Sequence, residues 1–168
     1  FLGHLYMIYN IITDPNPILH KRSADVDPAT VANPEMQRFV RDMIETMYAK
    51  DGVGLAAVQV NVSQQLCVIA KDFVPGKKKD LCLINPVWTK QSIKKNWDEE
   101  GCLSVPGVYG KVQRYSHIKV RALNEKGEQL EFEAKDFFAR IIQHECDHLN
   151  GTLFIEKAKD IRKPTLEL

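Results

Sequence analysis

Residues 144–148 read His-Glu-Cys-Asp-His, and this pentapeptide constrains the chain more than any other feature. His144 and His148 are four positions apart, so on a helix their side chains lie one turn apart on the same face. That spacing can hold one metal ion, with Glu145 beside it as a general base. We therefore expect a helix whose metal-binding face, which also carries Ile141, is packed inside layers of sheet.

The pentapeptide supplies two ligands, and the rest of the chain has to supply a third. One large metalloprotease family extends the motif with a glycine and a further histidine; Gly151 matches the glycine, but Phe154 occupies the histidine position. A second family takes a glutamate from a following helix. Here Glu167 lies in a tail just after Pro164, which leaves no room for such a helix. The third ligand is therefore expected upstream.

Cys102 is the best candidate for the third ligand. It lies between a charged, strand-like run and a turn expected at Pro106 and Gly107, and glycines on both sides allow a close approach of the backbone. A thiolate binds zinc or ferrous iron strongly, and one cysteine with two histidines leaves a position for water.

The other three cysteines are poorer candidates. Cys146 lies about 200° around the helix from His144 at about 100° per residue, so it is expected to point away from the metal. Cys67 and Cys82 lie in apolar runs and are expected in the core. The uneven spacing of the cysteines favours reduced thiols in the cytoplasm over a disulfide framework.

Length and charge agree with a small soluble enzyme. The 168 residues are most simply one domain, with 1–6 as an upstream extension or a cloning remnant and 156–168 as a short tail. The net charge of +1 gives no sign of a nucleic-acid partner. No apolar run approaches the roughly 20 residues that cross a bilayer, so no membrane association is expected.

Hydrophobic periodicity predicts two helices with strands between them. Asn33 and Pro34 are expected to cap and start the first helix, which ends at Gly52, and the second helix is expected over 136–150 with Gly151 as its stop. Strand-like runs lie at 66–70, 81–84, 87–97, 118–123 and 128–134, with a hairpin turn at 124–127. We therefore expect an α+β fold whose mainly antiparallel strands pack around the metal-binding helix.

Three motifs together resemble those of peptide deformylases. They are GVGLAAVQ at 52–59, EGCLS at 100–104 and QHECDHL at 143–149, in the family's order and at similar spacing. The resemblance covers residues 11 to 155 and is closest to the bacterial type 1 branch. It implies a metal-dependent hydrolase that removes the formyl group from the N-terminal formylmethionine of newly made polypeptides and releases formate.

The resemblance also implies roles for individual residues. The metal ligands are Cys102 and the two histidines of the pentapeptide. Glu145 accepts a proton from the attacking water and passes it to the leaving amine. The side chain of Gln59 and the backbone N–H of Leu103 stabilise the oxyanion, and one such donor contributes roughly 3–4 kcal/mol in comparable hydrolases.

Further positions are implied to shape the substrate site. Gly52 and Gly54 narrow it around a formyl group, and an ion pair between Glu100 and Arg114 fixes the segment that carries Cys102. The candidates for substrate contact are Gly52, Val53, Gly54, Glu100, Tyr109, Phe137 and Ile141, of which Val53, Phe137 and Ile141 are assigned to a methionine pocket.

The family resemblance extends to cofactor and partners. Ferrous iron is the expected metal in the cell, and zinc, nickel or cobalt can replace it in purified protein, because cysteine and histidine suit several ions. The expected partners are the formylmethionyl nascent peptide and, through transient contact, the ribosome. The tail keeps some positive charge for such a contact but is too short for a long docking helix.

Two other function classes stay open at this point. A metallopeptidase would use the same water and the same Glu145, although the absent histidine at 154 and the cysteine ligand argue against it. A non-catalytic metal-binding module would have a closed four-ligand site and no use for Glu145.

Overall fold

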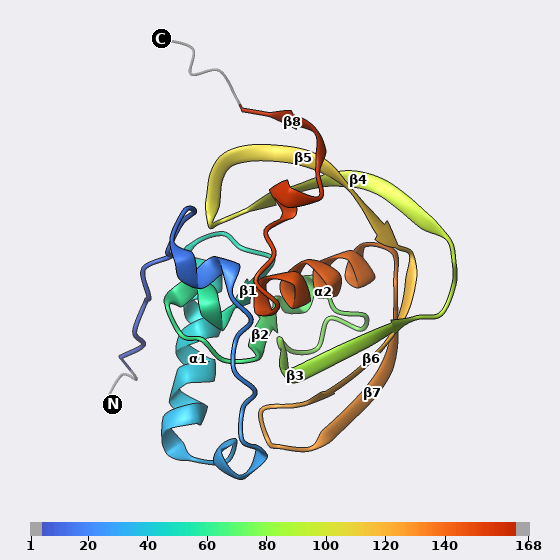
Figure 1. The fold of residues 1–168 in the computed structure, drawn as a ribbon. Helices are drawn as coiled ribbons and strands as arrows, with labels where there is room; N and C mark the ends of the chain where they lie inside the picture. The colour runs from blue at the N-terminus through green and yellow to red at the C-terminus, as the bar shows by residue number, and fades with distance from the viewer. Residues whose placement is uncertain (1–4, 164–168) are drawn as a thin grey trace.

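The computed structural model describes residues 5–163, in which two antiparallel sheets enclose a central helix (Figure 1). The larger sheet has the order β1-β2-β3-β6-β7, with β1 at Gly54–Ala56, β2 at Leu66–Ile69, β3 at Leu81–Lys90, β6 at His117–Leu123 and β7 at Gln129–Lys135. The smaller sheet has the order β4-β5-β8, with β4 at Lys95–Cys102, β5 at Val105–Tyr115 and β8 at Lys159–Arg162. The helices are α1 at Pro34–Ala49 and α2 at Asp136–Leu149.

The first strands of the larger sheet are covered on both faces. Alternate residues of a strand point to opposite faces, and in β2 Leu66 and Val68 join the hydrophobic cluster of α1, whereas Cys67 and Ile69 join that of α2. All four side chains are buried. This explains why β2 reads as a continuous apolar run rather than as an alternating pattern.

Helix α2 lies between the two sheets (Figure 1). It contacts β1, β2, β3, β6 and β7 on one side and β5 on the other. Ten of its 14 residues are buried, which is typical of a helix enclosed on nearly all sides. The expected α+β fold with antiparallel strands around a central helix is therefore confirmed.

The expected helix and turn boundaries mostly agree with the structure. Helix α1 begins at Pro34 with Asn33 at the N-cap position, as expected, although the side chain of Asn33 makes no capping hydrogen bond. Gly151 follows α2 with a φ of +80°, a conformation that favours glycine and ends the helix. In the hairpin at 124–127, Asn124 Oδ1 accepts hydrogen bonds from the backbone N–H groups of Lys126 and Glu128, both at 2.9 Å.

The single strand expected over 87–97 is wrong. Residues 87–90 continue β3, and β4 begins in the other sheet at Lys95. The chain changes sheets over 91–94, where the backbone N–H of Ser116 donates to the carbonyl of Lys94 at 3.0 Å. Because no glycine or proline marks this change, the run looks continuous in the sequence.

The turn expected at Pro106 and Gly107 lies earlier, at Leu103 and Ser104. Cys102 pairs with Val105, so both Pro106 and Gly107 are part of β5. The tight turn directly after Cys102 places the thiol at the end of β4, where it can face α2.

The tail expected at 156–168 contains a strand that the sequence pattern does not predict. Strand β8 pairs antiparallel with β5, although all four of its residues are exposed. The residues 1–4 of the expected extension, as well as Pro164 and Glu167, lie outside the described part of the chain. Between residues 5 and 163, none of the helices combines the length and apolarity that crossing a membrane requires.

Candidate metal centre and active-site pocket

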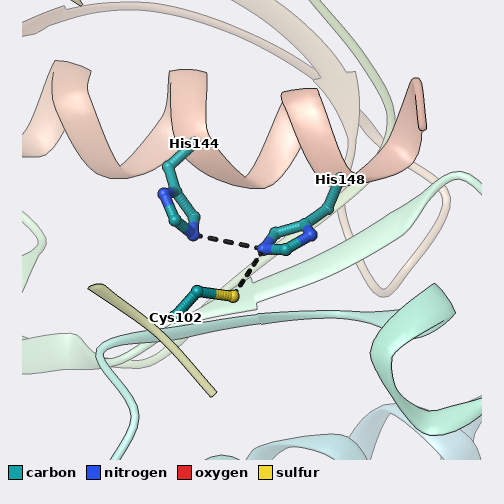
Figure 2. A group of neighbouring side chains, drawn as sticks. All are labelled: Cys102, His144 and His148. Carbon is teal, nitrogen blue, oxygen red and sulfur yellow. Dashed lines mark hydrogen bonds between the residues drawn. The ribbon is translucent and has the colours of Figure 1, made fainter. Parts of the chain in front are cut away.

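Helix α2 brings two imidazoles to one point. His144 and His148 are one turn apart, and their Nε2 atoms are 3.1 Å from each other (Figure 2). The two rings stand edge to face with centroids 4.8 Å apart. Both rings thus present the same nitrogen toward the end of β4.

Cys102 completes a group of three possible metal donors. Its Sγ is 3.2 Å from His148 Nε2, and the donor atoms of Cys102, His144 and His148 all lie within 4.8 Å of one another (Figure 2). It is the one group of this kind found within residues 5–163. Cys146 is not part of it and is buried in the core, as are Cys67 and Cys82.

Two of the three donor–donor distances are close to those around a tetrahedral metal ion. Zinc ligand distances of about 2.0–2.3 Å place neighbouring donors about 3.3–3.6 Å apart in a tetrahedron. The observed 3.1 Å between the nitrogens and 3.2 Å between sulfur and nitrogen are only a few tenths of an ångström shorter. A small outward shift of side chains would therefore accommodate an ion.

The surroundings of Cys102 favour the thiolate, which is the metal-binding form. Burial raises the pKa of Cys102, but the charge of His148 and hydrogen bonds from His144 and His148 outweigh it, so the pKa lies well below its ordinary value. The backbone N–H of Ser104 and the amide of Gln59 also donate to the sulfur, at 3.4 and 3.5 Å.

Glu145 is buried beside this group with one oxygen free. Glu145 is only 3% exposed, and its Oε2 has no hydrogen-bond partner within residues 5–163. Burial raises the pKa of Glu145 above the ordinary value, although His144 and His148 lower it. A buried carboxylate that is not used structurally can take up and return a proton.

Gly54 makes room for this carboxylate. A Cβ atom at residue 54 would lie 2.6 Å from Glu145 Oε1 and 3.1 Å from its Cδ. The φ of Gly54 is not positive, so space rather than backbone conformation requires glycine here.

A pocket of about 470 Å³ opens beside the donors and Glu145. Most of the residues singled out in the sequence line it: Gly52, Val53, Gly54, Gln59, Glu100, Cys102, Leu103, Tyr109, Phe137, Ile141, His144 and Glu145. Two do not, namely the donor His148, which is buried, and Arg114. Val53, Tyr109 and Phe137 are partly exposed at the rim, and Ile141 is buried.

Glu100 lies in a buried ionic network behind the donors. Its Oε1 accepts hydrogen bonds from His144 Nδ1 at 2.8 Å and from Arg114 at 2.9 Å, and its Oε2 accepts one from Arg140 at 2.7 Å. Burial raises the pKa of Glu100, but the bonds from His144 and Arg114 outweigh it and hold the pKa below its ordinary range. The ionised carboxylate thus orients the His144 ring with Nε2 toward Cys102.

Comparison with known proteins places this site in a family. Residues 8–164 match the sequence profile described as polypeptide deformylase. The chain belongs to the polypeptide deformylase family. It is accordingly an enzyme, and the assignment suggested by the three motifs is confirmed.

Individual members of the family are similar over nearly their whole length. Peptide deformylase 1 of Ralstonia nicotianae is 42% identical over 163 residues, which cover 96% of this chain and 92% of that protein. The peptide deformylase of Pelotomaculum thermopropionicum is 44% identical, with 93% of this chain and 95% of the relative covered. The crystal structure of the Thermotoga maritima peptide deformylase superposes with a TM-score of 0.84 at 36% identity, and the match covers 92% of this chain and 99% of that one.

A liganded deformylase structure is also similar. The actinonin-bound class I type b peptide deformylase of Acinetobacter baumannii has a TM-score of 0.83 and 33% identity, with 91% of this chain and 99% of that chain covered.

Three residues of this deformylase site were missed in the sequence. Arg140 and Asp147 belong to the network of Glu100, and Ser104 accepts a hydrogen bond from Gln59 Nε2 at 3.1 Å. A signal existed for Arg140, because it is a charged residue inside an apolar run and lies one helical turn before His144.

The cysteines provide a direct test of this geometry. With the metal removed, we expect iodoacetamide to label Cys102 rapidly and the other three cysteines only in denaturant. Burial raises the pKa of Cys82 and of Cys146 to about 12 and that of Cys67 well above its ordinary value, whereas Cys102 lines the pocket with a lowered pKa. Mass spectrometry of digested protein identifies the labelled residues. Added Zn²⁺ should protect Cys102, and labelling of Cys146 in the native state would contradict the placement.

Proposed function

We propose that this chain removes the formyl group from the N-terminal formylmethionine of newly made polypeptides and releases formate. One observation carries the proposal: three metal donors from β4 and α2 converge at the wall of a pocket that also holds a buried carboxylate with a free oxygen. The chain is proposed to form a single catalytic domain over 1–168, since α2 contacts strands of both sheets.

Cys102, His144 and His148 are proposed to hold one divalent ion, with Fe²⁺ as the ion in the cell and Zn²⁺, Ni²⁺ or Co²⁺ as substitutes in purified protein. When bound, such an ion supplies Lewis acidity and lowers the pKa of water. Three protein ligands leave a coordination position open, as in catalytic rather than structural sites.

Glu145 is proposed as the group that moves the proton. Its free Oε2 can accept a proton from water as the water attacks the formyl carbon, and the same atom can deliver it to the departing amine. Burial raises the pKa of Glu145, which is the direction that suits a carboxylate exchanging a proton with water.

Gln59 and Leu103 are proposed to stabilise the oxyanion. Gln59 is held in place at both ends, since its Oε1 accepts from the backbone N–H of Ala56 at 2.9 Å and its Nε2 donates to Ser104 Oγ. The amide therefore stays beside Cys102 without reorganisation, which is the condition under which such donors are effective.

The pocket is proposed to receive the methionine side chain. Val53, Phe137 and Ile141 provide an apolar wall, and Gly52 and Gly54 bring the backbone close to Glu145 and Leu103. A site with this little room favours formyl, the smallest acyl group, over acetyl. Tyr109 at the rim is proposed to contact the following residues of the peptide.

The proposed setting is the cytoplasm, where formylated nascent chains emerge. A transient ribosome contact is proposed through the exposed Lys159 of β8, since the other basic residue of this strand, Arg162, is paired with Glu99. This contact needs no deep docking surface.

A substrate comparison tests the proposed function. We expect formyl-Met-Ala-Ser to yield formate and a free amine in equal amounts, and an unblocked casein digest to stay uncut. Treatment with a chelator should stop formate release, and returning Fe²⁺ under anaerobic conditions should restore it. New peptides without formate would favour a metallopeptidase, and retained metal with neither reaction would favour a binding module. Metal analysis of anaerobically purified protein decides the native ion.

A further inference from the structure

The carboxylate of Glu100 is held by three side chains. Arg114 donates through Nε to Oε2 at 3.0 Å and through Nη2 to Oε1 at 2.9 Å. His144 Nδ1 takes the second bond to Oε1, and Arg140 Nη1 takes the second bond to Oε2 at 2.7 Å. Each oxygen thus accepts two hydrogen bonds. Three of the four come from the two arginines, and one comes from the proposed metal ligand His144.

The two arginines do not contribute equally. Arg114 is shared, because its Nη1 donates to the carboxylate of Asp147 at 2.5 Å. The other bonds of Arg140 go to neutral oxygens: the carbonyl of Val112 at 2.8 Å, and the carbonyl and side chain of Asn96 at 2.9 and 2.7 Å. Glu100 is therefore the one carboxylate that Arg140 contacts among the described residues, and the positive charge of Arg140 is not shared with a second acid.

Arg140 also connects the elements that carry the three donors. It lies one turn before His144 on α2, and its bonds to Asn96 and Val112 reach β4 and β5. Glu100 is two residues before Cys102 on β4. The guanidinium therefore fixes the strand with the thiol against the helix with the imidazoles.

Only one of the two imidazoles has such a support. His144 is oriented by Glu100, whereas the buried Nδ1 of His148 has no hydrogen-bond partner within the described residues. A change at Glu100 therefore reaches the metal centre through His144.

We propose that Arg140 is a positioning residue of the metal centre: it holds Glu100 Oε2 so that the carboxylate keeps His144 aligned with Cys102. The inference rests on the metal site proposed above. A purely structural role, in which Arg140 only joins α2 to the smaller sheet, makes a different prediction for the metal.

Cobalt binding to metal-free protein separates the two roles. Arg140→Met should raise the dissociation constant for Co²⁺ about 10-fold, the lower end of the range for changing a group bonded directly to a metal ligand, because Arg140 acts through Glu100; it should also alter the visible spectrum of bound Co²⁺. Arg140→Lys keeps the charge and can still donate a hydrogen bond to Glu100, so it should recover part of the affinity. Asn96→Ala is the matched control, because it removes a bond of Arg140 without touching Glu100.

The outcomes are distinguishable. Asn96→Ala should lower the melting temperature of the metal-free protein but leave the Co²⁺ affinity unchanged. Equal Co²⁺ affinity of Arg140→Met and wild type would overturn the positioning role, and so would an equal loss in Arg140→Met and Asn96→Ala. A wild-type protein that does not bind Co²⁺ one to one would instead overturn the proposed metal site.

Discussion

Glu145→Gln is expected to lower kcat for formate release about 10²–10⁴-fold, the contribution of a positioned acid–base group, while the metal content stays complete. Glutamine has nearly the same shape but cannot accept a proton from water. Because Glu145 is not among the three donors, the ion should be retained. Kinetics with formyl-Met-Ala-Ser and metal analysis of the same sample measure both quantities.

Two further variants sharpen this test. Glu35→Gln makes the same chemical change on the exposed first turn of α1 and should leave activity unchanged. Glu145→Asp keeps a carboxylate but withdraws it, so its activity should lie between that of the wild type and that of the glutamine variant. Full activity of Glu145→Gln would remove Glu145 from the mechanism, and loss of the metal would show that its role is structural.

Local periodicity was sufficient for the part of the site on α2. The spacing of His144 and His148 requires one shared face, and the same periodicity correctly turned Cys146 away from it. Cys102 could be chosen from its glycine-rich surroundings, but its distance of 3.2 Å from His148 depends on a turn three residues earlier than predicted.

Arg140 shows what local patterns do not contain. A charged side chain in a buried stretch is normally unfavourable, and nothing near it in sequence indicates a partner. Its partners lie 40 and 44 residues away, at Glu100 and Asn96. Such a residue becomes understandable only when the sheet brings these groups together.

The fold shows the same division between local and distant information. Strand β2 is predicted by its sequence because it is buried on both faces and therefore reads as a continuous apolar run. Strand β6 is predicted because its buried residues alternate with more exposed ones. Strand β8 was missed because it is short, charged and exposed, and it is a strand only through its pairing with β5. The break between β3 and β4 was missed because neither glycine nor proline marks it; its local signal is Ser92, whose Oγ accepts a hydrogen bond from the backbone N–H of Lys94 at 3.1 Å.

Gly54→Ala is expected to reduce kcat/KM about 10²-fold, the loss that a displacement of about 1 Å can cause in an active site. The new methyl group would be fixed to strand β1 at 2.6 Å from Glu145 Oε1, so the carboxylate, which is the far end of a side chain, is the group that has to move. Alanine fits the backbone of β1 without strain, so the protein should fold and keep its metal.

A double-mutant cycle with Glu145→Gln tests the cause of this loss. If Gly54 acts by leaving space for Glu145, alanine should add little loss once Glu145 is glutamine. Fully additive losses would mean that Gly54 acts on the substrate directly and not through Glu145.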